Sequence, residues 1–237
     1  MPARYRQLSS DSVHLWLGQP EDGAAGARAL SAQELHHAAG FIFPQHRARY
    51  VAARAALRRI LGGYLGLAAS DVPLRQGLHG KPYVAPAANP RAIRFNLSHS
   101  GAHLAVAVGC EHENGVDIEH VTSDVNFLEI ARGGFTAREF HALISHATGE
   151  RRDAFMRGWC RKEAYSKAMQ QGLARPLDSY DVSLRGDAQP LLLGDRADPK
   201  ATAEWTIWPI DTLRKLGIEG ALAVRRQVER VETFELG

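Results

Sequence analysis

The sequence predicts an α+β fold, because helical periodicity and strand-like alternation both recur along its 237 residues. The longest helical pattern runs from Gln45 to Leu65, and a second long amphipathic pattern begins at Arg151 and ends near Gly172. The strongest strand signal is "RAIRFNLSHSGAHLAVAVG", which predicts two strands joined at a Ser-His-Ser-Gly turn. A chain of this length fits one large domain or two small ones.

Composition narrows the class of protein. Hydrophobic residues make up 45% of the chain, and the net charge of +3 suits an anionic partner such as nucleic acid, a phosphate-rich cofactor or an acidic protein. The N-terminal residues contain no apolar signal core, and no apolar run is long enough to span a bilayer, so we expect neither a secretory signal nor a membrane span. The two cysteines, Cys110 and Cys160, fit no disulfide or zinc pattern, which favours a cytoplasmic setting.

The elements of the first half follow in chain order. "VHLWLG" predicts a first strand, and Ser31 followed by Glu34 forms a capping box that predicts the start of a helix. "HGKPYV" predicts a Gly-Lys-Pro turn that enters an extended segment. The Gln45–Leu65 helix has one apolar face that we expect to be buried, made of Tyr50, Ala53, Leu57, Ile60, Leu61 and Tyr64.

A stripe of arginines lies beside that apolar face, at Arg47, Arg54 and Arg58. It could be the solvated flank of an amphipathic helix, or it could be an anion site. No acidic residue occurs from Phe41 to Ser70. Because ordinary surface helices mix charges of both signs, this absence favours the anion site.

The second half begins after a charged turn. The turn separates the apolar strand His103–Val108 from "GVDIEHV", and this placement predicts a hairpin of the two. Residues Asn126–Gly134 are expected to be helical, and Thr136 with Glu139 forms a second capping box at the start of another helix. After the long helix we expect three strands, in "DSYDVSL", "AEWTIWPI" and "GALAVRRQ".

The stretch "GVDIEHV" places two carboxylates, Asp117 and Glu119, two positions apart. Side chains alternate along a strand, so both acids should project from one face while Val116 and Ile118 project from the other. At about 4 Å and an effective dielectric of ~20, two adjacent like charges repel by on the order of 4 kcal/mol. Either that face is solvated or a cation lies between the acids.

The long helix carries Trp159, Glu163 and Lys167 at spacing i, i+4 and i+8, which places them on one face. In isolation, this pattern is commonly a salt bridge beside a core tryptophan. Together with the two strand acids, Glu163 makes a set of three carboxylates that suits Mg²⁺, an ion that completes its shell with water and substrate phosphates. The arginine stripe and three lysines would hold the remaining phosphate charge: Lys81, Lys162 and Lys167. The combination predicts a magnesium-bound substrate that contains a polyphosphate.

His99 lies in a turn with Ser98, Ser100 and Gly101. A lone histidine is more often structural than functional. Clustered hydroxyls and backbone N–H groups in a glycine turn can nevertheless cradle a phosphate, so the turn is a second, weaker indication of a phosphate site.

Several motifs occur in one order along the chain: "KPYV", "FNLSHSG", "GVDIE", "FTAREF" and "WCRKEAYSKAMQQGL". With the helix "RYVAARAALRRIL", they resemble the surfactin-type 4′-phosphopantetheinyl transferases over roughly residues 40 to 185. The strongest parts are GVDIE and WxxKEAxxKA, whose separation also matches. The tryptophan and alanine of "WCRKEA" place the resemblance in the branch of broader carrier specificity.

The resemblance implies both a reaction and a fold. Members of that family transfer the 4′-phosphopantetheine arm of coenzyme A to a serine hydroxyl of an apo carrier protein, with Mg²⁺ bound, and release adenosine 3′,5′-bisphosphate. The implied fold is α+β with two similar halves related by a pseudo-twofold axis, here about residues 1–114 and 115–237. Coenzyme A and Mg²⁺ would lie in the cleft between the halves.

The resemblance also assigns roles to individual residues. The implied Mg²⁺ ligands are Asp117, Glu119 and Glu163. Glu163 is the first candidate for the base that takes the serine proton, and Glu139 is the second. Lys167 is expected to stabilise the leaving phosphate or to protonate it. The residues implied to bind coenzyme A are Arg49, Arg54, Lys81, Ser98, His99, Asp117, Lys162 and Lys167, with Arg47 or Arg58 as substitutes for the two arginines.

The implied partners are acyl, peptidyl or aryl carrier proteins of fatty-acid, polyketide or non-ribosomal peptide synthesis. Because such carriers are usually acidic around their serine, a basic enzyme would attract them. We expect docking along Val121–Phe135, with Phe127 and Leu128 as apolar contacts and Arg132 as a charged contact. We expect a monomer that binds neither nucleic acid nor membrane.

Three alternatives stay open. A basic module could bind nucleic acid without catalysis, although the chain has no helix-turn-helix, zinc or aromatic RNA-binding signature, and acids without a metal would repel phosphate. A Mg²⁺-dependent phosphohydrolase could use the same acids on water. An inactive family member is the third alternative, but every motif acid and lysine is present.

Overall fold

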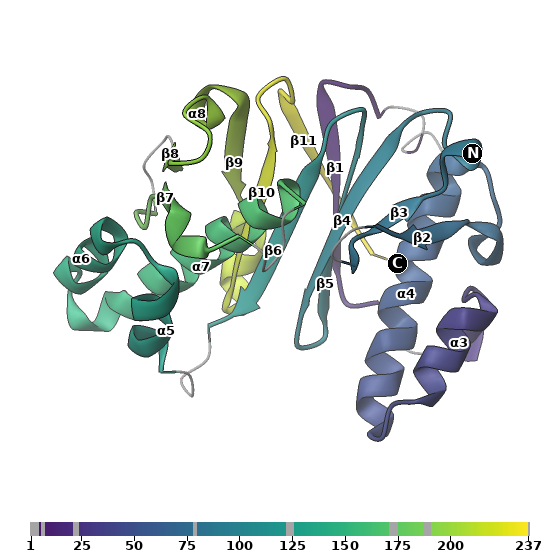
Figure 1. Ribbon diagram of the computed structural model, residues 1–237. Helices are drawn as coiled ribbons and strands as arrows, with labels where there is room; N and C mark the ends of the chain where they lie inside the picture. The colour runs from purple at the N-terminus through teal and green to yellow at the C-terminus, as the bar shows by residue number, and fades with distance from the viewer. Residues whose placement is uncertain are drawn as a thin grey trace.

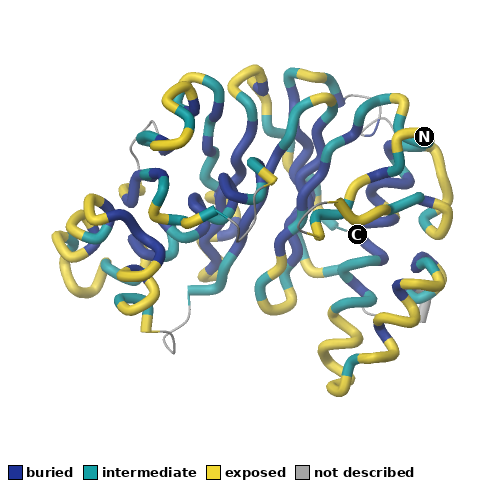
Figure 2. The backbone as a smooth tube through the Cα atoms, viewed as in Figure 1, coloured by how far each residue is buried: buried dark blue, intermediate teal, exposed yellow. Residues whose placement is uncertain are grey.

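Two β-sheets form the centre of the molecule, and one long helix covers the outer face of each (Figure 1). The computed structural model describes residues 5, 8–20, 24–77, 80–121, 126–170, 175–186 and 191–236. Figure 2 shows that the strands at the centre are largely buried and that exposed residues gather in the peripheral helices and in the loops. The predicted α+β class is confirmed.

The first sheet has four strands in the order β11-β1-β5-β4, with α4 on its outer face. The strands are β1 (Ser12–Gly18), β4 (Ile93–Ser100), β5 (His103–Cys110) and β11 (Arg230–Glu235). The helices of this half are α2 (Ala24–Ala27), α3 (Ala32–Ala39) and α4 (Pro44–Leu65), and a small two-stranded sheet joins β2 (Leu74–Gln76) to β3 (Pro82–Val84).

The second sheet has three strands in the order β6-β10-β9, with α7 on its outer face. Its strands are β6 (Asn114–His120), β9 (Trp205–Pro209) and β10 (Ile218–Arg225). The remaining elements of this half are α5 (Phe127–Gly134), α6 (Ala137–Ser145), α7 (Arg151–Ala168), α8 (Ala201–Glu204) and the paired strands β7 (Tyr180–Val182) and β8 (Leu192–Asp195).

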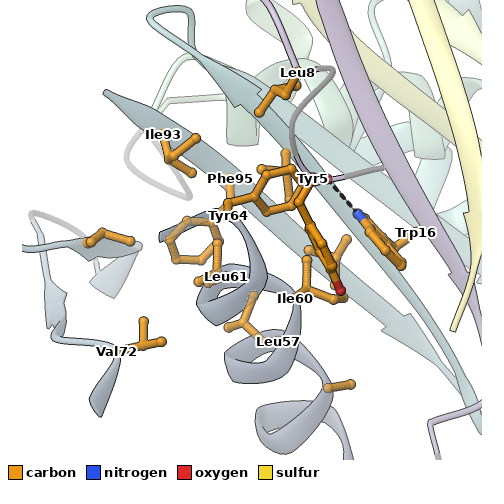
Figure 3. Packing of buried hydrophobic residues seen from close by; sticks show 14 of the residues in the cluster. Tyr5, Leu8, Trp16, Leu57, Ile60, Leu61, Tyr64, Val72, Ile93 and Phe95 are labelled. Atoms are coloured by element: carbon orange, nitrogen blue, oxygen red, sulfur yellow. Dashed lines mark hydrogen bonds between the residues drawn. The ribbon is translucent and has the colours of Figure 1, made fainter. Parts of the chain in front are cut away.

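The hydrophobic core follows this layering. Between α4 and the first sheet, residues such as Leu61 and Tyr64 of the helix pack on Phe95 of β4 (Figure 3). A second cluster fills the space between the two sheets and includes Leu15 of β1 and Ile118 of β6. The strand face of β6 that carries Val116 and Ile118 is therefore buried, as the alternation predicted.

The two halves repeat a short sequence that the structure explains. Residues 30–35 read Leu-Ser-Ala-Gln-Glu-Leu and residues 135–140 read Phe-Thr-Ala-Arg-Glu-Phe. Both segments form the predicted capping boxes, at the starts of α3 and α6. In each half, the capping glutamate also pairs with a cation of the long helix that follows. This recurrence is the local signature of the two similar halves.

The predicted hairpin between the strand His103–Val108 and "GVDIEHV" is wrong. Both edges of β5 are already occupied, by β1 and by β4, so β6 pairs with β10 instead. β6 also lies beside β4, but no backbone ladder joins them. Side chains on alternate residues of β4 accept hydrogen bonds from backbone N–H groups of β6: Asn96 from Val116 at 2.9 Å, Ser98 from Ile118 at 3.3 Å and Ser100 from His120 at 3.0 Å.

Two further differences concern the ends of elements. The long helix α7 ends at Ala168, earlier than the predicted end near Gly172, which lies outside the described residues. The strand β11 was not predicted, and it pairs in parallel with β1, so the sheet of the first half is completed by a segment from the second. The expected division at residues 114 and 115 therefore does not separate the two sheets by sequence. Of the described helices, none is both long and apolar enough to cross a membrane.

Candidate active site

The two strand acids face the long helix α7. Asp117 is buried and Glu119 is half-buried, and both lie on the face of β6 opposite to the core residues between the sheets. Gly115 on that same face lets the strand approach the helix, because a Cβ there would overlap the Ala164 carbonyl oxygen. This close approach brings Asp117 to Lys167 of α7.

Lys167 is the cation that the structure places at Asp117. Its ammonium nitrogen lies 2.6 Å from Asp117 Oδ1 and 3.4 Å from the hydroxyl of Ser98. The other oxygen, Asp117 Oδ2, is buried and finds no hydrogen-bond partner among the described residues. Burial raises the pKa of Asp117, although the charge of Lys167 and the Ser98 hydrogen bond act in the opposite direction.

The other two carboxylates belong to the same electrostatic cluster. Burial raises the pKa of both Glu119 and Glu163, and the negative charge of Asp117 raises each of them further. Glu163 also raises the pKa of Glu119. Because the negative charge of Asp117 raises the pKa of both neighbouring acids, an added cation would be favourable at this cluster.

The carboxylate oxygens of these acids are suitable donor atoms for a magnesium ion. The three side chains are not arranged around one point, however. Within the described residues, no group of three acidic, histidine or cysteine side chains is arranged to hold a metal ion. The fit rests on the hard carboxylate oxygens and on Asp117 Oδ2, a buried acceptor that lacks a donor. Lys167 instead supplies positive charge in this arrangement.

Two cavities flank the acid cluster. The first has a volume of about 1020 Å³ and lies between α4 and the β4–β5 turn. Among the described residues, its lining includes cationic or titratable side chains and no acidic ones: His46, Arg49, Arg54, His99 and His103. The second has a volume of about 460 Å³ and is lined by Glu163 and Lys167 beside Trp159.

Ser100 connects the first cavity to the acids. It lines that cavity, and its hydroxyl donates to Glu119 Oε2 at 2.9 Å. The acid cluster therefore lies between a large basic cavity and a smaller one that carries Glu163 and Lys167. An extended anionic substrate could place its nucleotide end in the first cavity and its reacting phosphate at the acids.

The arginine stripe on α4 is not the unneutralised cluster that its sequence suggests. Glu34 of α3 pairs with Arg54 at 2.6 Å and with Arg58. Arg58 is buried and also donates to the carbonyls of Ala69 and Val72, and its role as a substitute ligand for coenzyme A stays a prediction. The absence of acids from residue 41 to residue 70 was misleading, because the acid comes from the preceding helix. The capping box alone explains a glutamate at residue 34, so no local signal pointed to its pairing with arginines of the next helix.

Two predicted site residues, Lys162 and Glu139, pair with each other inside the fold. Lys162 is fully buried and pairs with Glu139 at 2.8 Å, while it donates to the carbonyls of Leu177 and Tyr180. Glu139 is also buried and accepts from the backbone N–H groups of Thr136 and Val182. The roles of Lys162 as a phosphate ligand and of Glu139 as a base stay predictions.

Lys81 also makes its contacts within the protein. Its ammonium group donates to Glu113 at 3.1 Å, to the Asn114 carbonyl at 3.3 Å and to the Lys167 carbonyl at 3.1 Å. These bonds join the segment before β3 to the start of β6 and the end of α7. These three bonds use all three protons of the ammonium group, so none is left for coenzyme A unless one bond is given up. A role of Lys81 in binding coenzyme A stays a prediction.

The structure thus divides the predicted site residues into three groups. Around the acids it gathers Ser98, Asp117, Glu119, Glu163 and Lys167. Around the first cavity it gathers Arg49, Arg54 and His99. Tied into the fold elsewhere are Lys81, Glu139 and Lys162.

Comparison with known proteins identifies relatives that match most of the chain. The family model described as the 4′-phosphopantetheinyl transferase superfamily matches residues 113–221, and the one described as 4′-phosphopantetheinyl transferase, N-terminal, matches residues 14–111. The chain is 38% identical over 181 residues to the 4′-phosphopantetheinyl transferase HetI of Nostoc sp., which covers 75% of this chain and 76% of HetI.

Two other relatives extend the comparison. The 4′-phosphopantetheinyl transferase Sfp of Bacillus subtilis is 32% identical over 174 residues, which covers 68% of this chain and 75% of Sfp. The human L-aminoadipate-semialdehyde dehydrogenase-phosphopantetheinyl transferase is 26% identical over 181 residues, covering 73% of this chain and 59% of the human protein. The expected family is confirmed: the chain belongs to the 4′-phosphopantetheinyl transferase superfamily.

Proposed function

We propose that this protein transfers the 4′-phosphopantetheine group of coenzyme A to a serine of an apo carrier protein in a Mg²⁺-dependent reaction and releases adenosine 3′,5′-bisphosphate. The observation that carries the proposal is the acid cluster of Asp117, Glu119 and Glu163, which lies with Lys167 between a basic cavity and a second cavity. Membership of the superfamily supports the transferase chemistry.

The first cavity would bind the nucleotide end of coenzyme A. Its volume of about 1020 Å³ accommodates a large ligand, and Arg49, Arg54 and His99 are among the described residues that line it, none of which is acidic. Arg54 is held in place by Glu34, whose negative charge offsets part of the attraction for an anion but fixes the orientation of the guanidinium group. Ser98, at the acids, would contact the pyrophosphate.

The reacting groups lie at the junction of the two cavities. The serine hydroxyl oxygen attacks the phosphorus that carries the pantetheine arm, and the bond from that phosphorus to the bridging oxygen breaks. Glu163 takes the serine proton directly or through a water, and its raised pKa suits a general base. Lys167 stabilises the phosphate that leaves or donates a proton to it.

Asp117, Glu119 and Glu163 would hold the magnesium ion. When bound, the ion supplies neutralisation of the pyrophosphate charge and an orientation for in-line displacement. Asp117 Oδ2, a buried acceptor without a donor among the described residues, would be one of the ligand atoms.

We propose that the carrier docks along Val121–Phe135. Within this segment residues 122–125 lie outside the described part of the structure, and Phe127 and Leu128 pack partly against the core cluster of α5 and α7. Arg132 is exposed and lies over the ring of Phe140, so it is available to an acidic partner. The carrier class, a monomeric state and a cytoplasmic setting stay predictions.

An Arg132→Glu variant tests the charged part of this docking surface. We expect its KM for an acidic carrier to rise by roughly 3- to 10-fold, because the exchange replaces attraction by repulsion at the rim of the interface. The KM for coenzyme A should not change. An unchanged carrier KM would remove Arg132 from the interface.

The reaction itself is tested by the intact mass of an apo acyl carrier protein after incubation with this protein, coenzyme A and Mg²⁺, beside an EDTA control. A Mg²⁺-dependent gain of roughly 340 Da, the mass of one phosphopantetheine group esterified to the serine, is expected. Consumption of coenzyme A without any carrier would favour a phosphohydrolase. Salt-sensitive binding of random DNA that ignores EDTA, without a mass gain, would favour a nucleic-acid-binding module.

A further inference from the structure

The hydroxyls of Ser98 and Ser100 share two kinds of hydrogen bond that serve different purposes, and Ser98 also accepts from the Lys167 ammonium group at 3.4 Å. Each hydroxyl accepts a backbone N–H of β6, which joins the two sheets. Each hydroxyl also donates to a carboxylate of the acid cluster, Ser98 to Asp117 Oδ1 at 3.0 Å and Ser100 to Glu119 Oε2 at 2.9 Å. The serines are two residues apart on β4, and the acids are two residues apart on β6.

This double bonding fixes the hydroxyl direction. A serine hydroxyl has one proton, and the β6 N–H group occupies an acceptor position of the oxygen. The proton is then left for the adjacent carboxylate. The same contact between the sheets therefore sets which oxygen of each acid is engaged and which oxygen remains for a cation. At Asp117 that remaining oxygen is Oδ2, which has no partner.

We propose that Ser100, with Ser98, is a positioning residue that orients the carboxylates of Glu119 and Asp117 for a divalent cation. The inference rests on the proposed function, because it concerns the same acids. It goes beyond that function by giving Ser100 a role through Glu119 rather than through substrate. It also makes the contact between the two sheets part of the metal site.

Asn96 provides a matched control within the same strand. Its side-chain oxygen accepts from the Val116 N–H at 2.9 Å, so it joins β4 to β6 in the same way. No carboxylate contact accompanies it. If the serines matter only because they join the sheets, Asn96→Ala and Ser100→Ala should behave alike. If they orient the acids, only the serine variant should weaken cation binding.

The experiment is a titration with Mn²⁺, in which electron paramagnetic resonance measures the free ion, on the wild-type chain and on Ser100→Ala, Ser100→Thr and Asn96→Ala. We expect Ser100→Ala to raise the Kd for Mn²⁺ by about 10-fold, the range typical for outer hydrogen-bond partners of metal ligands. Ser100→Thr keeps the hydroxyl and should bind as the wild type does. Asn96→Ala should lower the melting temperature but leave the Kd within about 2-fold, since it touches no ligand.

The outcomes separate this inference from the proposed function. Equal Mn²⁺ binding by wild type and Ser100→Ala, or equal weakening in Asn96→Ala, would overturn the role of Ser100 while leaving the metal site intact. Failure of the wild type to bind Mn²⁺ would overturn both. In transfer assays the Mg²⁺ concentration for half-maximal rate should rise for Ser100→Ala, with no change in the KM for the carrier.

Discussion

Glu163→Gln is expected to reduce the rate of phosphopantetheine transfer by at least about 100-fold. Loss of a residue that only hydrogen-bonds to a metal ligand already costs about 10- to 100-fold in metal affinity or activity, and Glu163 is proposed as both a ligand and the base. Binding of coenzyme A should change little, since Glu163 does not line the first cavity. Single-turnover kinetics with an apo carrier measures the first quantity, and calorimetry without carrier measures the second.

The same variant should be more stable than the wild type when metal is removed. Burial and Asp117 raise the pKa of Glu163 in the folded state, so its ionised form opposes folding at neutral pH. That penalty is present above the folded pKa and disappears as the pH falls below the unfolded value. Glutamine removes it, and the melting temperature in EDTA should therefore rise at pH 7.

A suitable control is Glu150→Gln, just before the first residue of α7. Its side chain is 69% exposed and makes only a 3.8 Å contact with His146. It should retain wild-type activity and stability. Wild-type activity in Glu163→Gln itself would remove Glu163 from the mechanism.

Lys162→Met is expected to destabilise the protein by about 3–5 kcal/mol, the typical cost of leaving one charge of a buried pair without its partner. Lys162 is fully buried, and its removal strands Glu139 and the carbonyls of Leu177 and Tyr180. Urea denaturation measures the free energy of unfolding, with an unchanged m-value showing that the transition keeps its cooperativity.

A second substitution makes this prediction specific. Adding Glu139→Gln to Lys162→Met removes the stranded charge, and glutamine can still complete the capping box of α6. The double variant should recover part of the lost stability. A stable Lys162→Met protein with a raised KM for coenzyme A would instead show that Lys162 binds phosphate, as the family resemblance suggested.

Local sequence signals predicted the elements, because the interactions that start and orient them are local. The two capping boxes lie at the predicted residues, and the spacing of Trp159, Glu163 and Lys167 places all three in the lining of the second cavity. The alternation in β6 correctly separated the buried face from the acidic one.

Partner choice could not be predicted, because it depends on contacts between distant segments. In the sequence, nothing near Arg58 or Lys162 indicates that their charges are paired. In the fold, Glu34 pairs with Arg58 and Glu139 pairs with Lys162. Chain order predicts β6 as the hairpin partner of β5, but β1 and β4 occupy the two edges of β5. Family resemblance assigned phosphate roles to residues whose charges are used in the fold of this chain.

The parallel pairing of β1 with β11 affects the order of folding during synthesis. The register joins Ser12 to Arg230, so β1, which is synthesised early, cannot complete its pairing before β11 is synthesised. Until β11 emerges from the ribosome, one edge of β1 has no partner, and open edges promote wrong pairing with other chains. Contacts between residues so far apart in sequence also slow folding. The first half of the protein therefore reaches its final form only after nearly the whole second half has been translated.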